Sequence, residues 1–271
     1  MGKEDRILLD HGSGGRASHE LVREVFLPLF KNSLLEELDD SAVFEIGDQR
    51  LAFSTDSYTV DPIFFPGGDI GCLAVNGTVN DLAMRGATPL YLSAGFIIEE
   101  GFLISDLQRI LASMKDAAGT AGVKIVAGDT KVVYRQDVDQ IFINTAGIGV
   151  IGLNTNISGS SARAGDCVLI SGTVGDHGVT ILSKRGEFTF DAPIQSDSAP
   201  LNGLVREMMS VSDQIHAMRD PTRGGLATSL NEIAIQSNVG IELEEDRIPV
   251  HDSVTAACEI LGLDPLYICL L

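Results

Sequence analysis

Three aspartates stand next to predicted strands, where a carboxylate could bind a metal ion. Asp40 precedes a strand in DDSAVF, Asp56 closes the apolar run LAFST, and Asp129 follows a strand in VAGDTKVV. A carboxylate at the end of a strand in an open α/β sheet points into the crevice where such sheets bind ligands. Each position alone is more often a turn residue, because Asp side chains readily cap turns. Taken singly, these three aspartates therefore indicate turns.

A fourth aspartate, Asp81, lies inside a predicted helix in NGTVNDLAMRG. Both Asn80 and Asp81 have poor helix propensity, so their presence in a helix interior needs a reason. A solvent-exposed face and a ligand role explain Asp81 equally well.

The fifth aspartate belongs to the strongest chemical motif of the chain, RDPTRGG. Asp220 is followed there by Thr222, Arg223, Gly224 and Gly225, and a predicted helix comes next. Free N–H groups at a helix start bind anions, and Arg supplies a bidentate fork for phosphate oxygens. The motif therefore favours a site for phosphate and a metal ion. The glycine-rich HGSGG at 11–15 is weaker, because it lacks the spacing of a Walker or dinucleotide loop.

The charge of the chain limits which ligands it can bind. It has 38 acidic and 19 basic residues, a formal net charge of -19 at pH 7. The basic residues do not cluster, so the surface should repel nucleic acids and anionic membranes. A polyphosphate can still bind to such a protein if a divalent metal ion bridges the two negative groups.

The elements that must position these residues alternate between strand and helix. The length of 271 residues predicts one large or two packed α/β domains. In the first half, periodicity predicts helices over 17–31, 70–85 and 103–118, and strands over 43–46, 51–55, 90–98, 123–127 and 140–150. The Gly- and Ser-rich segment 151–165 is the predicted linker, which separates domains at 1–155 and 160–271.

The second half is also predicted to mix strands and helices. Strands are expected over 167–171, 215–218 and 240–243, and helices over 178–184, 201–209, 226–236 and 250–261.

The cysteines and the N-terminal segment predict a cytoplasmic protein. The four cysteines lie far apart with no CxxC pair, which fits a reducing compartment. The first ten residues lack a basic region followed by an apolar run, and no segment has the length of a membrane span.

The residues and the order of these motifs resemble those of the hydrogenase maturation family HypE, which belongs to the aminoimidazole ribonucleotide synthetase (PurM)-like superfamily. The resemblance spans 9–267 and rests on HGSGG, DDSAVF, STDSY with DPIFFPGG, NGTVNDLAMRG, AGDTKVV, SGTVGDHG and RDPTRGG. It implies a two-domain PurM-like architecture of α/β plus α+β type. The N-terminal domain would bind ATP and form a homodimer, and ATP and Mg2+ would lie between the domains.

The resemblance also implies the residues of the site. Aspartates in the matching motifs hold the metal ions that bridge the ATP phosphates, here Asp40, Asp56, Asp81 and Asp220. The implied nucleotide-binding positions are Gly14, Gly15, Asp56, Asp81, Asp129, Thr130, Thr222 and Gly224. Among the catalytic candidates, Lys131 would stabilise developing negative charge, Glu232 would act as the base, and Arg223 would contact phosphate. Without the resemblance, Lys131 and Glu232 would be interpreted as solvated surface residues.

Members of this family use ATP to dehydrate a carbamoyl group on the sulfur of their own C-terminal cysteine. The resulting thiocyanate supplies cyanide to the iron of nickel–iron hydrogenase, with the carbamoyltransferase HypF and the HypC–HypD scaffold complex as partners. This chain ends ICLL after the matching segment LGLDPLYI, whereas the family continues to a final cysteine. We therefore expect an incomplete second domain and impaired dehydration, with Cys269 in an apolar run rather than serving as the carrier.

Other interpretations stay open from the sequence. Selenophosphate synthetase would place a reactive Cys or selenocysteine in the glycine-rich opening, where this chain has Ser13. Aminoimidazole ribonucleotide synthetase and thiamine-phosphate kinase share the aspartates but lack FFPGG and GDTKVV. An inactive dimerisation partner or scaffold would differ by showing no magnesium-dependent ATP binding.

Overall fold

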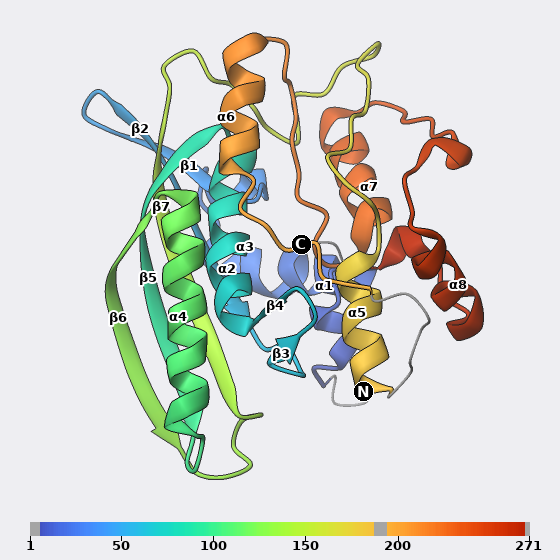
Figure 1. Cartoon of the computed structure of the whole chain (residues 1–271). Helices are drawn as coiled ribbons and strands as arrows, with labels where there is room; N and C mark the ends of the chain where they lie inside the picture. The colour runs from blue at the N-terminus through green and yellow to red at the C-terminus, as the bar shows by residue number, and fades with distance from the viewer. Residues whose placement is uncertain (1–5, 187–193, 269–271) are drawn as a thin grey trace, which may run out of the picture.

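The first half of the chain is built on one twisted, five-stranded sheet (Figure 1). The structure is a computed structural model that describes residues 6–186 and 194–268. Only β5 and β6 pair in parallel, and the other neighbours are antiparallel. In spatial order the strands are β1 (Ala42–Ile46), β2 (Gln49–Tyr58), β7 (Ile141–Ile151), β5 (Ala87–Glu99) and β6 (Lys124–Val133).

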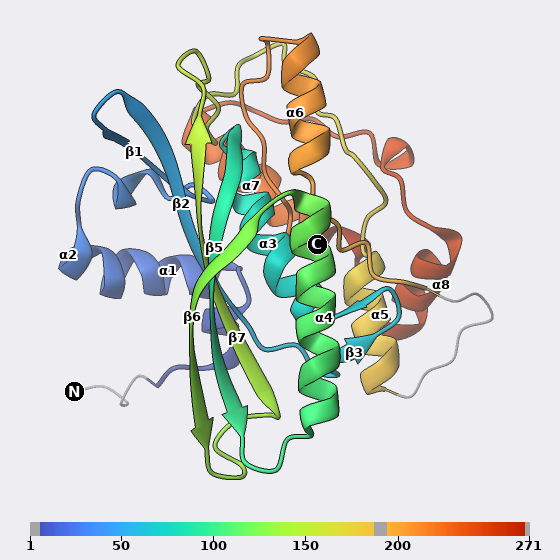
Figure 2. The same ribbon diagram turned by 60° about the vertical axis from the view of Figure 1, so that its left-hand side comes forward.

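Two helices cover one face of this sheet, α3 (Ile70–Met84) and α4 (Ile104–Ala121). Figure 2 shows the sheet nearly edge-on, with α4 on the side opposite the N-terminal helices. Helix α3 is apolar on nearly all sides and is buried along almost its whole length, because it packs between the sheet, α4 and the second half. It starts at the N-cap Asp69, whose side chain accepts hydrogen bonds from two backbone N–H groups of the first turn.

The N-terminal segment forms an interrupted helix rather than the continuous one predicted over 17–31. A π-helical turn at Val22–Phe26 separates α1 (Arg16–Leu21) from α2 (Leu27–Phe30). The cause is Pro28, which lacks the N–H that a regular α-helix would use at this point. Short 3-10 turns flank the segment at Leu9–Gly12 and Leu35–Glu37, and a two-stranded ribbon, β3 (Phe64–Phe65) and β4 (Gly68–Asp69), precedes α3.

The second half of the chain is helical in its described residues. Its α-helices are α5 (Asp176–Arg185), α6 (Asn202–Val211), α7 (Gly225–Ser237) and α8 (Asp252–Leu261), with 3-10 turns at Glu245–Arg247 and Pro265–Tyr267. The predictions of strands over 167–171, 215–218 and 240–243 were wrong: these segments run through the described chain without strand pairing. A strand needs a hydrogen-bonded neighbour, and local propensity cannot supply one.

Asparagines of α3 join the two halves. The Asn80 side chain donates to the Ala199 carbonyl at 3.0 Å and accepts from the Leu201 N–H at 2.8 Å. One turn earlier, Asn76 donates to Ser198 Oγ at 3.1 Å. This explains why a residue of poor helix propensity occupies position 80: its amide satisfies the backbone of a segment that crosses the helix.

Two further sequence-based expectations concern the ends of the chain and the membrane. Cys269 lies outside the described residues. Within the part of the chain that the structure describes, no helix combines the length and the apolar character needed to cross a bilayer.

Candidate functional site

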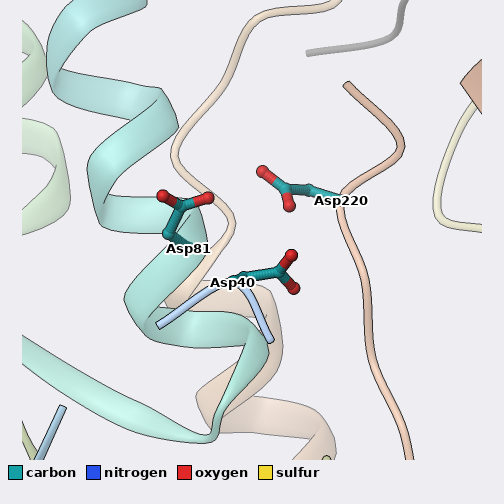
Figure 3. A group of neighbouring side chains, drawn as sticks. All are labelled: Asp40, Asp81 and Asp220. Atoms are coloured by element: carbon teal, nitrogen blue, oxygen red, sulfur yellow. The ribbon is translucent and has the colours of Figure 1, made fainter. Parts of the chain in front are cut away.

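Three aspartates from distant parts of the sequence meet between the two halves (Figure 3). Asp40 lies just before β1, Asp81 on α3, and Asp220 in the loop before α7. Each offers one carboxylate oxygen, and these oxygens lie within 4.8 Å of one another. The sequence-based prediction that these three positions form one site is therefore consistent with the geometry.

The Asp220 carboxylate is buried and those of Asp40 and Asp81 are half-buried, and this raises the pKa of each. Burial raises the pKa of Asp40 to about 7, although the Arg219 guanidinium opposes the rise. Burial, then the negative charges of the other members of the group, raise the pKa values of Asp81 and Asp220 well above their usual range. The Oδ2 atom of Asp220 is buried without a hydrogen-bond partner among the described residues. A hard divalent cation with oxygen ligands would satisfy all of these groups.

Neighbouring polar groups hold two of the aspartates in place. Ser54 Oγ, on β2, donates to Asp81 Oδ2 at 2.5 Å and lies 3.1 Å from the backbone oxygen of Asp40. The residue before Asp40 is also anchored, because Asp39 pairs with the buried Arg85 at the end of α3. The Asp39 carboxylate accepts from Ser158 Oγ at 2.7 Å, which ties the segment after β7 to the site.

A line of ionisable side chains runs from Asp40 to the N-terminal helix. Arg219 Nη1 donates to Asp40 Oδ1, and its Nη2 lies 2.8 Å from Glu232 Oε2 on α7. Glu232 Oε1 lies 3.0 Å from His19 Nε2 on α1. Both oxygens of Glu232, the base expected from the resemblance, are thus occupied by neighbours.

The two glycine-containing motifs of the sequence pack against each other. Gly14 has φ +79°, and a Cβ there would lie 2.5 Å from Arg223 Cβ, so only glycine fits. Arg223 also acts on the site, since its charge partly offsets the burial that raises the pKa of Asp56. In the same turn, the Thr222 N–H donates to the Asp220 carbonyl at 2.9 Å, and Gly224 is the N-cap of α7. HGSGG, with Gly14 and Gly15, therefore lies beside the RDPTRGG turn rather than forming an independent loop.

Asp56 does not belong to the close group of three, and it lies within β2 rather than after its end. Its strand continues to Tyr58, so Ser54, Asp56 and Tyr58 alternate with exposed residues and share the face toward α3. Burial, then the charge of Asp56, raise the pKa of Tyr58 well above its usual value. Sequence reasoning missed Ser54 and Tyr58, although the two-residue period of STDSY could have indicated both.

The strand β6 carries three predicted site residues that a single chain does not bring to the aspartates. Asp129, Thr130 and Lys131 lie inside β6 and are exposed, with Lys131 Nζ 3.4 Å from Asp129 Oδ2. Strands β7 and β5 separate β6 from β2, so three interstrand spacings of about 4.8 Å lie between them. The expectation that Asp129 directly follows its strand was also wrong, because β6 extends to Val133.

Comparisons with known proteins place both halves in one family. The family model described as "AIR synthase related protein, N-terminal domain" matches residues 38–151, and that described as "AIR synthase related protein, C-terminal domain" matches residues 163–268. The carbamoyl dehydratase HypE of Cupriavidus necator is 54% identical over 267 residues, which cover 98% of this chain and 76% of that protein.

Solved structures agree with the sequence relatives. A crystal structure of a HypE–HypF complex superposes with a TM-score of 0.88 at 54% identity, covering 92% of this chain and 81% of that chain. A hydrogenase maturation protein HypE in complex with ATP superposes with a TM-score of 0.80 at 57% identity, covering 98% and 79%.

Removing one buried carboxylate should stabilise the metal-free protein at high pH. Each of these carboxylates has a higher pKa in the folded protein than in the unfolded chain, where it is about 4. The folded state therefore loses stability as the pH rises from about 4 through the folded pKa, which is about 7 for Asp40. We expect Asp220→Asn, in the presence of a chelator, to increase the free energy of unfolding at pH 8 by about 1–3 kcal/mol, and by less at pH 4.5. Urea denaturation at both pH values measures this.

The matched control for this measurement is Asp116→Asn, because Asp116 is exposed on α4. This variant should follow the wild-type pH dependence. Equal stability of Asp220→Asn and wild type at pH 8 would contradict the assignment of an uncompensated buried charge.

Proposed function

Because this chain belongs to the AIR synthase related family, and within it to the HypE carbamoyl dehydratases, we propose that it uses ATP to convert an S-carbamoyl cysteine into a thiocyanate during hydrogenase maturation. The observation that carries the proposal is the meeting of Asp40, Asp81 and Asp220 between the two halves. Such a group can hold a triphosphate through cations, which the net charge of -19 would otherwise repel.

The chemistry explains why ATP is needed. An amide oxygen is a poor leaving group, so the γ-phosphoryl group is transferred to the carbamoyl oxygen and ADP is released. The carbamoyl nitrogen then loses both of its protons as the C–O bond breaks, and phosphate leaves with the former amide oxygen. The products are a thiocyanate, ADP and phosphate, so one molecule of water has been removed from the carbamoyl group.

The three clustered carboxylates fit magnesium, a hard cation that prefers oxygen ligands. Asp40, Asp81 and Asp220 would hold it, with Asp56 as a further ligand, and the ion would neutralise charge on the phosphates. The RDPTRGG turn faces the same site through Arg219, Asp220 and the influence of Arg223 on Asp56. We assign Arg223 to phosphate binding, together with backbone N–H groups of Gly14, Gly15 and Gly224 and the Thr222 hydroxyl.

A second copy of the chain would complete the site. Asp129, Thr130 and Lys131 lie on β6, which has no neighbour on its outer edge among the described strands. Apolar side chains on the sheet and its edge are also exposed, including Tyr91 (46%), Val126 (62%) and Val132 (67%). An unpaired edge beside exposed apolar residues favours association with another sheet. In a homodimer, Lys131 would stabilise negative charge in the partner's site.

Glu232 is assigned a different role from the one its motif suggested. Its contacts with Arg219 and His19 occupy both carboxylate oxygens, so proton abstraction would first require one contact to break. We propose that Glu232 is a positioning residue that orients Arg219 toward Asp40.

The relative that was solved with HypF supports the proposal that this chain binds HypF as its carbamoyl donor. The free cysteines among the described residues (Cys72, Cys167 and Cys258) accord with a cytoplasmic location, which we also propose.

The central test supplies the substrate as a short peptide with an S-carbamoyl cysteine. With ATP and Mg2+, mass spectrometry should show that the peptide loses one water, and ADP should form in equal amount. Asp81→Asn should reduce the rate at least about 100-fold, because the cation loses a ligand. The exposed Asp116→Asn on α4 is the control and should keep the wild-type rate. Absence of magnesium-dependent ATP binding by calorimetry would instead indicate a scaffold.

Mixed dimers test whether Lys131 acts in the partner's site. Lys131→Ala and Asp81→Asn should each be inactive alone. Mixed in equal amounts and allowed to exchange, they should recover about a quarter of wild-type activity, because half of the dimers contain one intact site. If the mixture stays inactive while mass spectrometry detects mixed dimers, Lys131 does not act across the interface.

Glu232→Gln separates orientation from proton abstraction. If Glu232 orients Arg219 and so Asp40, the variant should weaken magnesium-dependent ATP binding about 3- to 10-fold, as expected when a charge-assisted contact is lost. Calorimetry with a non-hydrolysable ATP analogue measures this. Unchanged binding with a large fall in turnover would support the base instead.

A further inference from the structure

Tyr58 is a buried polar residue that the roles above do not use. It lies near the end of β2, is 6% exposed, and faces α3 on the same side of the strand as Ser54 and Asp56. Its ring belongs to the main core cluster, with Val75 and Ile143 among the members. Packing alone would be served equally well by Phe, which places the same ring without a polar atom.

The packing around Tyr58 leaves space for its hydroxyl group. A Cβ at Gly77 of α3 would lie 2.1 Å from Tyr58 Oη, so this glycine leaves the space that the hydroxyl occupies. Glycine has poor helix propensity, so Gly77 makes the helix less stable, but its missing side chain leaves room for the hydroxyl.

Although the structure leaves room for the hydroxyl, the residues that it describes provide no hydrogen-bond partner of good geometry for it. It is buried and forms no hydrogen bond of good geometry among the described residues, although Asp56 and Thr78 lie beside it. A buried hydroxyl without a partner costs free energy, so such a group calls for an explanation, and a bound ligand that accepts its hydrogen bond is one.

The surroundings indicate the chemistry of that missing partner. Tyr58 shares its strand face with Asp56 and with Ser54, whose hydroxyl donates to Asp81 Oδ2, and this places the Tyr58 hydroxyl beside the acidic site. Burial, then the negative charges of Asp56, Asp81 and Asp220, raise its pKa. Arg219, another donor there, uses Nη1 and Nη2 for Asp40 and Glu232, while its Nε is buried without a partner among the described residues. A ligand held at the carboxylates through cations would bring anionic oxygens, and these would accept a hydrogen bond from Tyr58.

We propose that Tyr58 is a binding residue that donates its hydroxyl hydrogen bond to a phosphoryl oxygen of the nucleotide. This inference rests on the proposed function, since it takes the ligand at the carboxylates to be a triphosphate.

Tyr58→Phe tests the proposal, because it removes only the oxygen. Calorimetry with Mg2+ and a non-hydrolysable ATP analogue should show binding weakened about tenfold or more, the usual effect of losing a hydrogen bond to a charged group. The nucleotide-free variant should melt at the wild-type temperature or higher, since an unsatisfied buried hydroxyl has been removed. A merely structural hydroxyl would give the opposite pattern, lower stability with unchanged nucleotide binding.

Gly77→Ala provides a second measurement that keeps the hydroxyl but displaces it. The added methyl group collides with Tyr58 Oη, so this variant should also bind the analogue more weakly than wild type. The control is Tyr267→Phe, because Tyr267 is 65% exposed on the surface of the second half. It should leave both binding and melting temperature unchanged.

The possible failures are distinct. If wild type does not bind the analogue with Mg2+, the proposed function fails. If wild type binds and Tyr58→Phe binds equally well, the assignment of Tyr58 to a phosphoryl oxygen is overturned while the proposed function stands. Unchanged nucleotide binding with slower dehydration of the carbamoyl peptide would also overturn it and place the hydroxyl at the carbamoyl group.

Discussion

Mutual repulsion among three carboxylates, one buried and two half-buried, is the constraint on which the rest of this structure depends. Asp40, Asp81 and Asp220 lie within 4.8 Å of one another, and burial raises the pKa of every member. Such an arrangement opposes folding unless protons or cations compensate it. Its persistence therefore points to binding rather than to stability, as is common for perturbed acidic groups in clefts.

The fold keeps this group together by drawing the aspartates from three separate segments, helix α3 for Asp81 and the stretches just before β1 and α7 for Asp40 and Asp220. Helix α3 is buried along nearly its whole length and fixes Asp81, while Arg219 joins the Asp220 loop to Asp40. Asn80, next to Asp81 on the same helix, secures the segment that crosses from the second half. The contacts that hold the two halves together are thus the same contacts that bring the carboxylates close.

The elements around this site were predictable to different degrees. Periodicity placed α3 and α4 well, because both have long apolar patterns between clear boundaries. Periodicity predicted β2 and β6 to be shorter than they are. The residues that follow LAFST in β2 still pair with β7, and those that follow IVAG in β6 still pair with β5. Periodicity also predicted strands over 167–171, 215–218 and 240–243 that the described chain does not form, because pairing depends on neighbours that a local pattern does not contain.

The sequence by itself determined the chemical inventory: carboxylates in recognisable motifs, an arginine and glycines before a helix, and a strongly negative charge. Only the tertiary structure decided which of these meet. It brought Asp40, Asp81 and Asp220 together, engaged Glu232 with Arg219, and left Lys131 on an exposed strand. The reason is physical: residue type sets what a side chain can do, whereas distance and burial set its strength, and both arise from packing between segments far apart in the chain.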